Sequence, residues 1–312
     1  MAALIDSIGV VSGALGIVSF LQDNLPSDPA EGAAIKVKAG LANDDDPGMG
    51  GEVSAAYAWD TNNNYLGKAD GEEIKTGDIA EITIDSSSPG TAAEYVAVST
   101  GDDAVCVAWI TVANHDGSLK GGAWTGDIGY KCDQHWYQQD EAAGKIPDSN
   151  DDYIPHCTWL DADHTGDTPS AAVKFKTRAY GEAVKDTVDS GDPCKFTKFG
   201  PDDGPIADPI DKRAPRPRQP WMEERLIVSN RKQHKAEELC SSGTSWGPDF
   251  VGTDGMFCDM GTKTLSPLCS TRDVDGCVNV DEEGNRVTKR SLVAKRSVDM
   301  DHKTYTKINT WG

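Results

Sequence analysis

Eight cysteines constrain the fold of this 312-residue chain more than any other feature. They are Cys106, Cys132, Cys157, Cys194, Cys240, Cys258, Cys269 and Cys277. Their number is even, and no Cys-x-x-Cys spacing indicates a zinc or redox site. The last four crowd among Gly, Ser and Asp, where little core could form without crosslinks. We therefore predict four disulfides and, with them, an extracellular protein.

The pairing of these cysteines is not fixed by the sequence, because eight cysteines allow about a hundred connectivities. Proximity favours two bridges within the last four cysteines and a local Cys132–Cys157 pair. Buried free thiols are the alternative.

The chain is acidic, with 51 Asp and Glu against 30 Lys and Arg and a formal net charge of −21. Binding nucleic acid requires a basic surface, so we exclude nucleic acid as a partner. Two cationic segments, 212–235 and 286–307, interrupt this acidic background. Either they are a solvated linker and tail, or they lie against acidic surface of this chain or of a neighbour.

An apolar stretch at residues 6–21 predicts a helix that ends near Pro26. Gly9, Gly13 and Gly16 give it a smooth face suited to self-association. The stretch lacks the basic start and cleavage site of a signal peptide, and a bilayer span needs about 20 apolar residues. Three interpretations stay open: a docking helix, an atypical secretion signal, and a membrane-inserting or self-associating helix.

Hydrophobic residues recur with period two from Ala33 to about Asn114, which is typical of half-buried strands. Ala104 to Val112 is apolar on both faces, as in a central strand. Clusters of Asp, Asn and Gly separate these strands. We predict a mostly β fold, an antiparallel β-sandwich with an N-terminal helix and a small disulfide-rich C-terminal module. The expected divisions are a helix over 1–30, the sandwich over 31–200, a Pro-rich linker over 201–220, the module over 221–285 and a basic tail over 286–312.

Three dibasic pairs end at Arg213, Arg290 and Arg296. Kexin-type proteases cut after such pairs, so these arginines are candidate processing sites; chance pairs in a basic tail are the alternative. Lys303 to Trp311 predicts a strand suited to adding to a sheet edge.

Several runs in the second half of the chain carry a family resemblance. They are Cys157 to Thr165, Gly247 to Val251, Phe257 to Met260 and the Lys-Arg pairs of the tail. Together they resemble a group of uncharacterised proteins of filamentous fungi from about residue 100 onward. The resemblance implies a secreted fungal protein and brings no activity or site residues with it.

The segment that starts with Asp161 and Asp163 matches the first half of a calcium-binding loop. Asp167 and His164 lie close by in the sequence. Ala172 stands where the loop needs its last acidic ligand. These four residues are candidate ligands for Ca2+ or a transition metal, although no cofactor is required. An Asp-rich turn is the alternative.

Two further sequence patterns match functional motifs but also have simpler structural explanations. Gly243 to Gly247 matches the G-x-S-x-G nucleophile elbow, but Pro248 and Asp249 stand where the following helix should begin, so we interpret it as chance. Aromatic and amide residues at 133–140 suit either carbohydrate stacking or the edge of a core.

The sequence thus favours a secreted, non-catalytic protein that acts by binding or self-assembly after trimming at dibasic sites. A membrane-active toxin or effector that uses the N-terminal helix is the first alternative, and a secreted hydrolase is the second. Expected partners are another protein or a second copy, with a membrane surface or a carbohydrate as further options.

Overall fold

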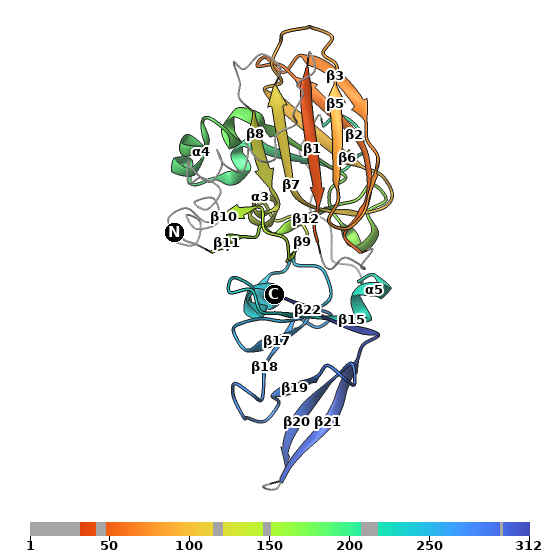
Figure 1. The fold of residues 1–312 in the computed structure, drawn as a ribbon, viewed down its shortest axis with the longest axis vertical. Coiled ribbons are helices and arrows are strands. Elements are labelled where there is room, and N and C mark those ends of the chain that lie inside the picture. Colours follow the sequence, from red (N-terminus) through yellow and green to blue (C-terminus); the bar gives the residue numbers. More distant parts are fainter. Residues whose placement is uncertain (1–31, 42–47, 115–120, 146–150, 207–217, 294–295) are drawn as a thin grey trace. The chain divides into compact units, whose positions relative to one another are not determined.

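The structure is a computed structural model that describes residues 32–41, 48–114, 121–145, 151–206, 218–293 and 296–312. The chain divides into two compact units, residues 1–214 and 215–312, called here the first and second unit (Figure 1). The predicted N-terminal helix, with Gly9, Gly13 and Gly16, lies outside the described residues, and so does Arg213.

Two antiparallel sheets make up most of the first unit. The first sheet has the order β5-β1-β7-β12-β9, with β8 paired to β7. Its strands are β1 (Ala33–Ala39), β5 (Ile79–Ile84), β7 (Val105–Asn114), β8 (Gly122–Thr125), β9 (Trp136–Tyr137) and β12 (Cys157–Leu160). Strand β7 is buried along its whole length, which confirms the expected central strand.

The second sheet has the order β14-β13-β6-β2-β3, with β4 paired to β2. Its strands are β2 (Gly51–Trp59), β3 (Tyr65–Asp70), β4 (Glu73–Ile74), β6 (Tyr95–Thr100), β13 (Ala172–Lys176) and β14 (Thr197–Gly200). One buried core takes side chains from both sheets, among them Ile35 and Val37 of β1 and Val96 and Val98 of β6. The period-two pattern produces this core, because alternate side chains of a strand point to the same face.

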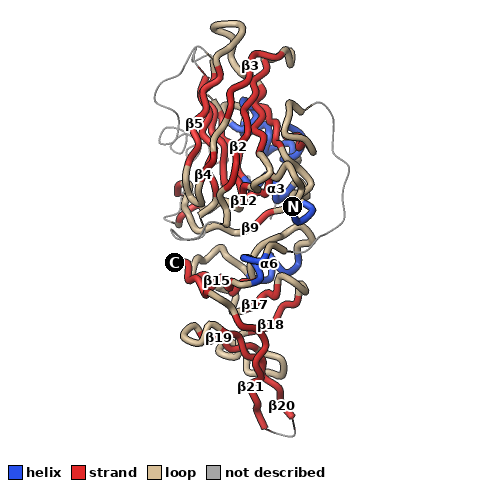
Figure 2. Tube along the Cα trace, turned by 90° about the vertical axis from the view of Figure 1, so that its right-hand side faces the viewer, coloured by secondary structure: helices blue, strands red, loops and turns tan. Residues whose placement is uncertain are grey.

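Short elements connect these strands. The helices are α3 (Gly126–Lys131) and α4 (Val184–Ser190), the 3-10 helices are η1 (Thr165–Asp167), η2 (Thr177–Tyr180) and η3 (Pro193–Phe196), and β10 (Gly144–Lys145) pairs with β11 (Asp152–Tyr153). Strands dominate the described residues of both units (Figure 2), which confirms the predicted mostly β fold with antiparallel sheets.

The second unit contains a mixed five-stranded sheet of order β18-β17-β16-β15-β22 and a three-stranded sheet of order β19-β20-β21. Its elements are α5 (Pro220–Glu223), β15 (Arg225–Ser229), α6 (Ala236–Ser241), β16 (Asp249–Val251), β17 (Met256–Asp259), β18 (Thr264–Pro267), β19 (Val278–Asp281), β20 (Arg286–Val293), β21 (Arg296–Thr304) and β22 (Lys307–Trp311). Strand β15 runs parallel to both β16 and β22. The predicted tail strand thus occupies an edge of its own chain's sheet.

Four disulfides join all eight cysteines: Cys106–Cys157, Cys132–Cys194, Cys240–Cys258 and Cys269–Cys277. The prediction of two bridges within the last four cysteines is confirmed. The predicted Cys132–Cys157 pair is wrong, because β12 lies beside β7, which carries Cys106, while Cys132 ends α3 next to η3. Four bridges are typical of extracellular proteins. Within the described ranges, no helix is long and apolar enough to cross a membrane.

Candidate functional site

The predicted metal residues lie in the turn between β12 and β13. The Oδ2 atom of buried Asp161 accepts a hydrogen bond from Thr165 Oγ1 at 2.5 Å. Asp163 Oδ1 accepts the Thr165 backbone N–H at 2.8 Å, and His164 Nδ1 lies 2.8 Å from the Thr168 carbonyl oxygen. In the part of the chain that the structure describes, no three His, Cys, Asp or Glu side chains are grouped to hold a metal ion. An Asp-rich turn accounts for these contacts, and the calcium site stays a prediction.

The fourth predicted ligand, Asp167, is buried at the end of η1 with a backbone φ of 60°. A left-handed conformation is common for Asp in turns. Asp167 therefore fits the same turn.

Removing the charge of Asp161 is expected to stabilise the first unit. Burial raises the pKa of Asp161 to about 6, and the nearby Asp163 carboxylate adds to this shift. Because the folded pKa lies above the unfolded one, this group favours folding more as pH falls from about 7 to about 4. Asp161→Asn keeps an acceptor for Thr165 and should raise the free energy of unfolding by about 2 kcal/mol near pH 7.5.

Thermal unfolding near pH 5 and near pH 7.5 measures this effect. The advantage of Asp161→Asn should shrink at the lower pH, whereas Asp102→Asn, in an exposed turn, should behave like the unmodified protein at both. An equal advantage at both pH values would exclude titration of Asp161 as the cause.

The aromatic and amide residues at 133–140 belong to the core. Trp136 and Tyr137 form β9 and are fully buried, and Gln138 and Gln139 are buried beside them. The Gln139 amide donates to the Pro155 carbonyl at 3.0 Å. The core-edge interpretation is therefore confirmed, and these aromatic rings offer no stacking surface.

An Asp–His pair that the sequence analysis missed lies beside this segment. The Oδ1 atom of Asp127 accepts from His156 Nδ1 at 2.6 Å and from the His156 backbone N–H at 3.0 Å, and Oδ2 accepts from the Tyr153 hydroxyl. The Gln138 Nε2 atom lies 3.4 Å from His156 Nε2, and two aromatic rings pack on the imidazole. Both ring nitrogens have neighbours, so the pair anchors residues 151–156 to α3.

The match to a nucleophile elbow is a loop between α6 and β16. Ser245 is 5% exposed, and its hydroxyl donates to the Leu239 carbonyl at 2.6 Å. Lys263 Nζ donates to the Ser245 carbonyl at 2.7 Å and to its hydroxyl oxygen. Burial lowers the pKa of Lys263 to about 8, and the Arg218 charge adds to this. A buried serine that donates to a carbonyl makes a poor nucleophile. Lys263 Nζ also donates to the Leu239 carbonyl of α6 at 3.3 Å, so this lysine joins α6 to the loop after it.

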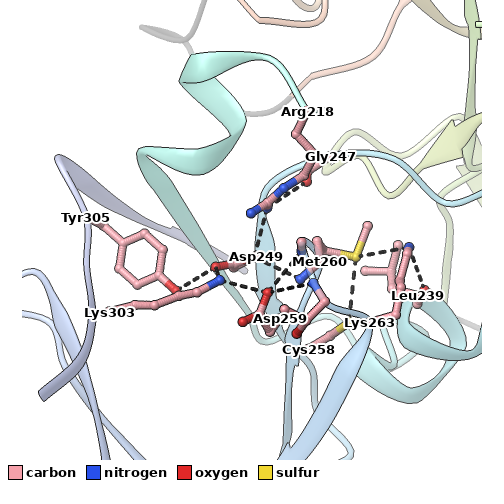
Figure 3. A network of polar contacts seen from close by, with 12 residues as sticks. Arg218, Leu239, Gly247, Asp249, Cys258, Asp259, Met260, Lys263, Lys303 and Tyr305 are labelled. Carbon is pink, nitrogen blue, oxygen red and sulfur yellow. Dashed lines mark hydrogen bonds and ion pairs between the residues drawn. The ribbon is translucent and has the colours of Figure 1, made fainter. Parts of the chain in front are cut away.

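A buried carboxylate, Asp249, organises the second unit (Figure 3). Its Oδ1 accepts from Arg218 Nη1 and from the Met260 backbone N–H, both at 2.8 Å. Its Oδ2 accepts from Lys303 Nζ and from the Tyr305 hydroxyl, again at 2.8 Å. Four donors occupy both oxygens, so this carboxylate is a structural centre.

Lys303 also bridges to a second carboxylate. Its Nζ lies 2.7 Å from Asp259 Oδ1, which also accepts the backbone N–H groups of Gly261 and Thr262 (Figure 3). Burial raises the pKa of Asp259, but Lys303 and these N–H groups outweigh it and hold the pKa below its usual value. Lys303, in the cationic tail, thus lies against acidic residues of its own chain.

The structure describes the surroundings of Arg290 among the three candidate processing sites in most detail. Arg290 lies within β20, between β19 and β21. Its N–H donates to the Cys277 carbonyl and its carbonyl accepts from the Gly276 N–H, each at 2.8 Å. Proteases bind extended, locally unfolded segments, so the sheet shields Arg290 in the folded protein. Arg296 begins β21 and Arg213 lies outside the described residues, so cleavage at either stays a prediction.

The outer face of the second sheet of the first unit carries aromatic rings beside unpaired lysines. We call the cluster of Trp59, Tyr65, Tyr95, Lys174 and Lys198 the aromatic–lysine face. Register places Trp59 opposite both Tyr65 and Tyr95, and Lys174 opposite Lys198. The alternate residues of β6 and β13 fill the core, so these side chains point away from it.

Lys174 is the most unusual member of this face. The residue is only 8% exposed, and its Nζ lies 3.5 Å from the ring centroid of Trp59 and donates to Asn63 Oδ1 at 2.8 Å. Burial, together with the charge of Lys198, lowers the pKa of Lys174 to about 8. Across the described ranges, no carboxylate forms an ion pair with Lys174 or Lys198.

Neighbouring lysines do have counterions. Lys176 lies 3.4 Å from Glu94, and Lys68 lies 3.2 Å from Asp70. The chain's own segment 201–206 reaches part of this face, where the Tyr57 hydroxyl donates to the Asp203 carbonyl at 3.2 Å. Lys174 and Lys198 thus face each other without carboxylates, and they form the candidate binding site.

The sequence alone did not indicate this site. Trp59, Tyr95, Lys174 and Lys198 come from four strands, and only the register brings them together. No known protein family, no curated protein and no solved structure matches this chain. The resemblance to fungal proteins accordingly stays a prediction.

Proposed function

We propose that this chain is a secreted, non-catalytic fungal protein whose first unit, a β-sandwich, binds an anionic ligand on the aromatic–lysine face. The observation that supports this proposal is the opposed pair of Lys174 and Lys198 without a carboxylate partner. Like charges directly opposite each other on a sheet are destabilising. A bound anion would supply the missing countercharge.

The burial of Lys174 distinguishes it from the other described lysines of the first unit that have no carboxylate partner. With 51 acidic residues against 30 basic ones, carboxylates are in surplus. Burying an ammonium group without a counterion is costly, yet Lys174 is almost fully buried. Its contacts with Trp59 and Asn63 hold the charge in place, as a preorganised site requires.

Binding accounts for the remaining polar clusters better than catalysis does. The Asp127–His156 pair and the Ser245–Lys263 pair are both tied to neighbouring groups. The membrane-active alternative and self-association through Gly9, Gly13 and Gly16 depend on residues outside the described ranges, so no observation favours them. Four disulfides support secretion.

Neutralising Lys198 is expected to weaken polyanion binding. The probes are immobilised polygalacturonate, polyphosphate and polyglutamate at low salt. The unmodified protein should bind at least one of them, and Lys198→Ala should weaken that binding about tenfold, because a charged hydrogen bond is lost. Lys198→Arg should keep most of the affinity, and added salt should reduce it.

Lys36→Ala is the matched control, because it changes the net charge equally but lies in the other sheet. There Lys36 contacts Glu81 at 3.0 Å. This variant should bind like the unmodified protein. Failure to bind any probe, or an equal loss in both alanine variants, would refute the proposed site.

A further inference from the structure

The rings of the aromatic–lysine face form a row across three neighbouring strands. Tyr95 of β6, Trp59 of β2 and Tyr65 of β3 are in register, so their side chains share one face. The ring centroids of Trp59 and Tyr65 are 6.0 Å apart. Neighbouring strands lie about 4.8 Å apart, so the outer two rings, on β6 and β3, are separated by about the length of two pyranose units.

The three rings have different parts in this row. Trp59 is buried, with the Lys174 ammonium over its ring and Tyr57 stacked at 6.2 Å, so it serves as support. Tyr65 is 52% exposed and Tyr95 is half-buried. The rings that a ligand can touch are therefore Tyr65 and Tyr95, on either side of Trp59.

The Lys174 ammonium lies over the middle ring of this row, and Lys198 lies on β14 at the sheet edge. Lys174 and Lys198 are opposed on β13 and β14, and Lys174 Nζ lies 5.7 Å from the Tyr95 ring centroid. Asn63, in the exposed turn between β2 and β3, accepts from Lys174. A fitting ligand is extended, with apolar faces at regular intervals and negative charges along one side.

We infer that the ligand is an acidic polysaccharide, an inference that rests on the proposed anion-binding function. Each sugar ring of such a chain has an apolar face of C–H groups, which packs on a tyrosine ring. Each carboxylate projects from the ring edge and can meet the exposed Lys198, while the buried Lys174 adds positive charge behind it. Polyphosphate has no apolar faces, and an acidic peptide has no rigid rings repeated at the spacing of strands.

Matched polymers test this inference on the full chain. Affinity for polygalacturonate is compared by titration calorimetry with affinity for its methyl ester, which has the same backbone without charge, and for polyphosphate and polyglutamate. Polygalacturonate should bind about tenfold more tightly than each of the other three polymers. Tyr65→Ala should weaken polygalacturonate binding about fivefold and leave any polyphosphate binding unchanged.

Ile79→Ala is the control, because Ile79 is also an exposed apolar side chain but lies on β5 of the other sheet. It should leave all affinities unchanged. Equal binding of the ester would overturn the requirement for charge. Equal binding of polyphosphate or polyglutamate, with no effect of Tyr65→Ala, would overturn the polysaccharide but leave anion binding intact. No binding to any polyanion would overturn the proposed function itself.

Discussion

Asp249→Ala is expected to lower the free energy of unfolding of the second unit by about 3–5 kcal/mol. The substitution removes the acceptor for Arg218, Lys303 and Tyr305 at once. Arg218 would remain buried without a partner carboxylate, and an uncompensated buried charge is the costliest result of breaking an ion pair. The loss would also weaken the attachment of residues 303–305, which precede β22, although Lys303 keeps its contact with Asp259.

Hydrogen exchange measures this effect for the second unit alone, through peptides that cover β15, β16 and β22. Protection there should fall in Asp249→Ala, while peptides from β7 should be unchanged. Asp273→Ala is the control, because Asp273 forms an exposed ion pair with Arg290, worth less than about 1 kcal/mol. Similar protection in the two variants would show that the buried network contributes little.

Removal of the Cys106–Cys157 bridge should have the second large effect. The bridge closes a loop with a sequence separation of 51, and the entropy of such a loop corresponds to about 4 kcal/mol. It joins β7 to β12 within the first sheet, and both cysteines are fully buried. The double variant Cys106→Ala, Cys157→Ala should therefore unfold at much lower denaturant concentration.

The short Cys269–Cys277 bridge provides the comparison. Its sequence separation is 8, so its removal should cost about 2.5 kcal/mol, and in the second unit only. Urea unfolding followed by hydrogen exchange separates the two units. A larger loss from the short bridge than from the long one would contradict the loop-entropy argument.

The sequence predicted the strands of the first unit well, because their signal is local. Ile35 and Val37 alternate with lysines, and Ala80, Ile82 and Ile84 alternate with polar residues. Strands β1 and β5 have these buried positions in the structure. Half-burial of a strand leaves this pattern whatever the strand pairs with.

Pairing between distant strands was not predictable in the same way. The parallel pairs of β15 with β16 and β22 join segments far apart in the chain, and no local pattern indicates them. The wrong Cys132–Cys157 pair has the same origin, since proximity in sequence does not fix which strands are neighbours. Register depends on the complete sheet and its turns.

The candidate site shows most clearly that contacts between distant strands cannot be predicted from local sequence. Lys174 alternates with Val173 and Phe175 in the sequence, and lysines in such a pattern indicate only a solvated surface. Its unusual character comes from Trp59 beneath its ammonium and Lys198 opposite it. Both contacts require the order β14-β13-β6-β2, which no segment of the sequence contains by itself.

The position of β22 also sets the order in which the chain folds during synthesis. One edge of β15 stays unpaired until residues 307–311 have left the ribosome, because β22 pairs there. Until then His234 and Phe250 lack their ring contacts with Trp311. The two sheets of the first unit use strands that end by Gly200, so they can close much earlier. The nascent second unit thus exposes an open strand edge to aggregation and chaperones until β22 has emerged and paired.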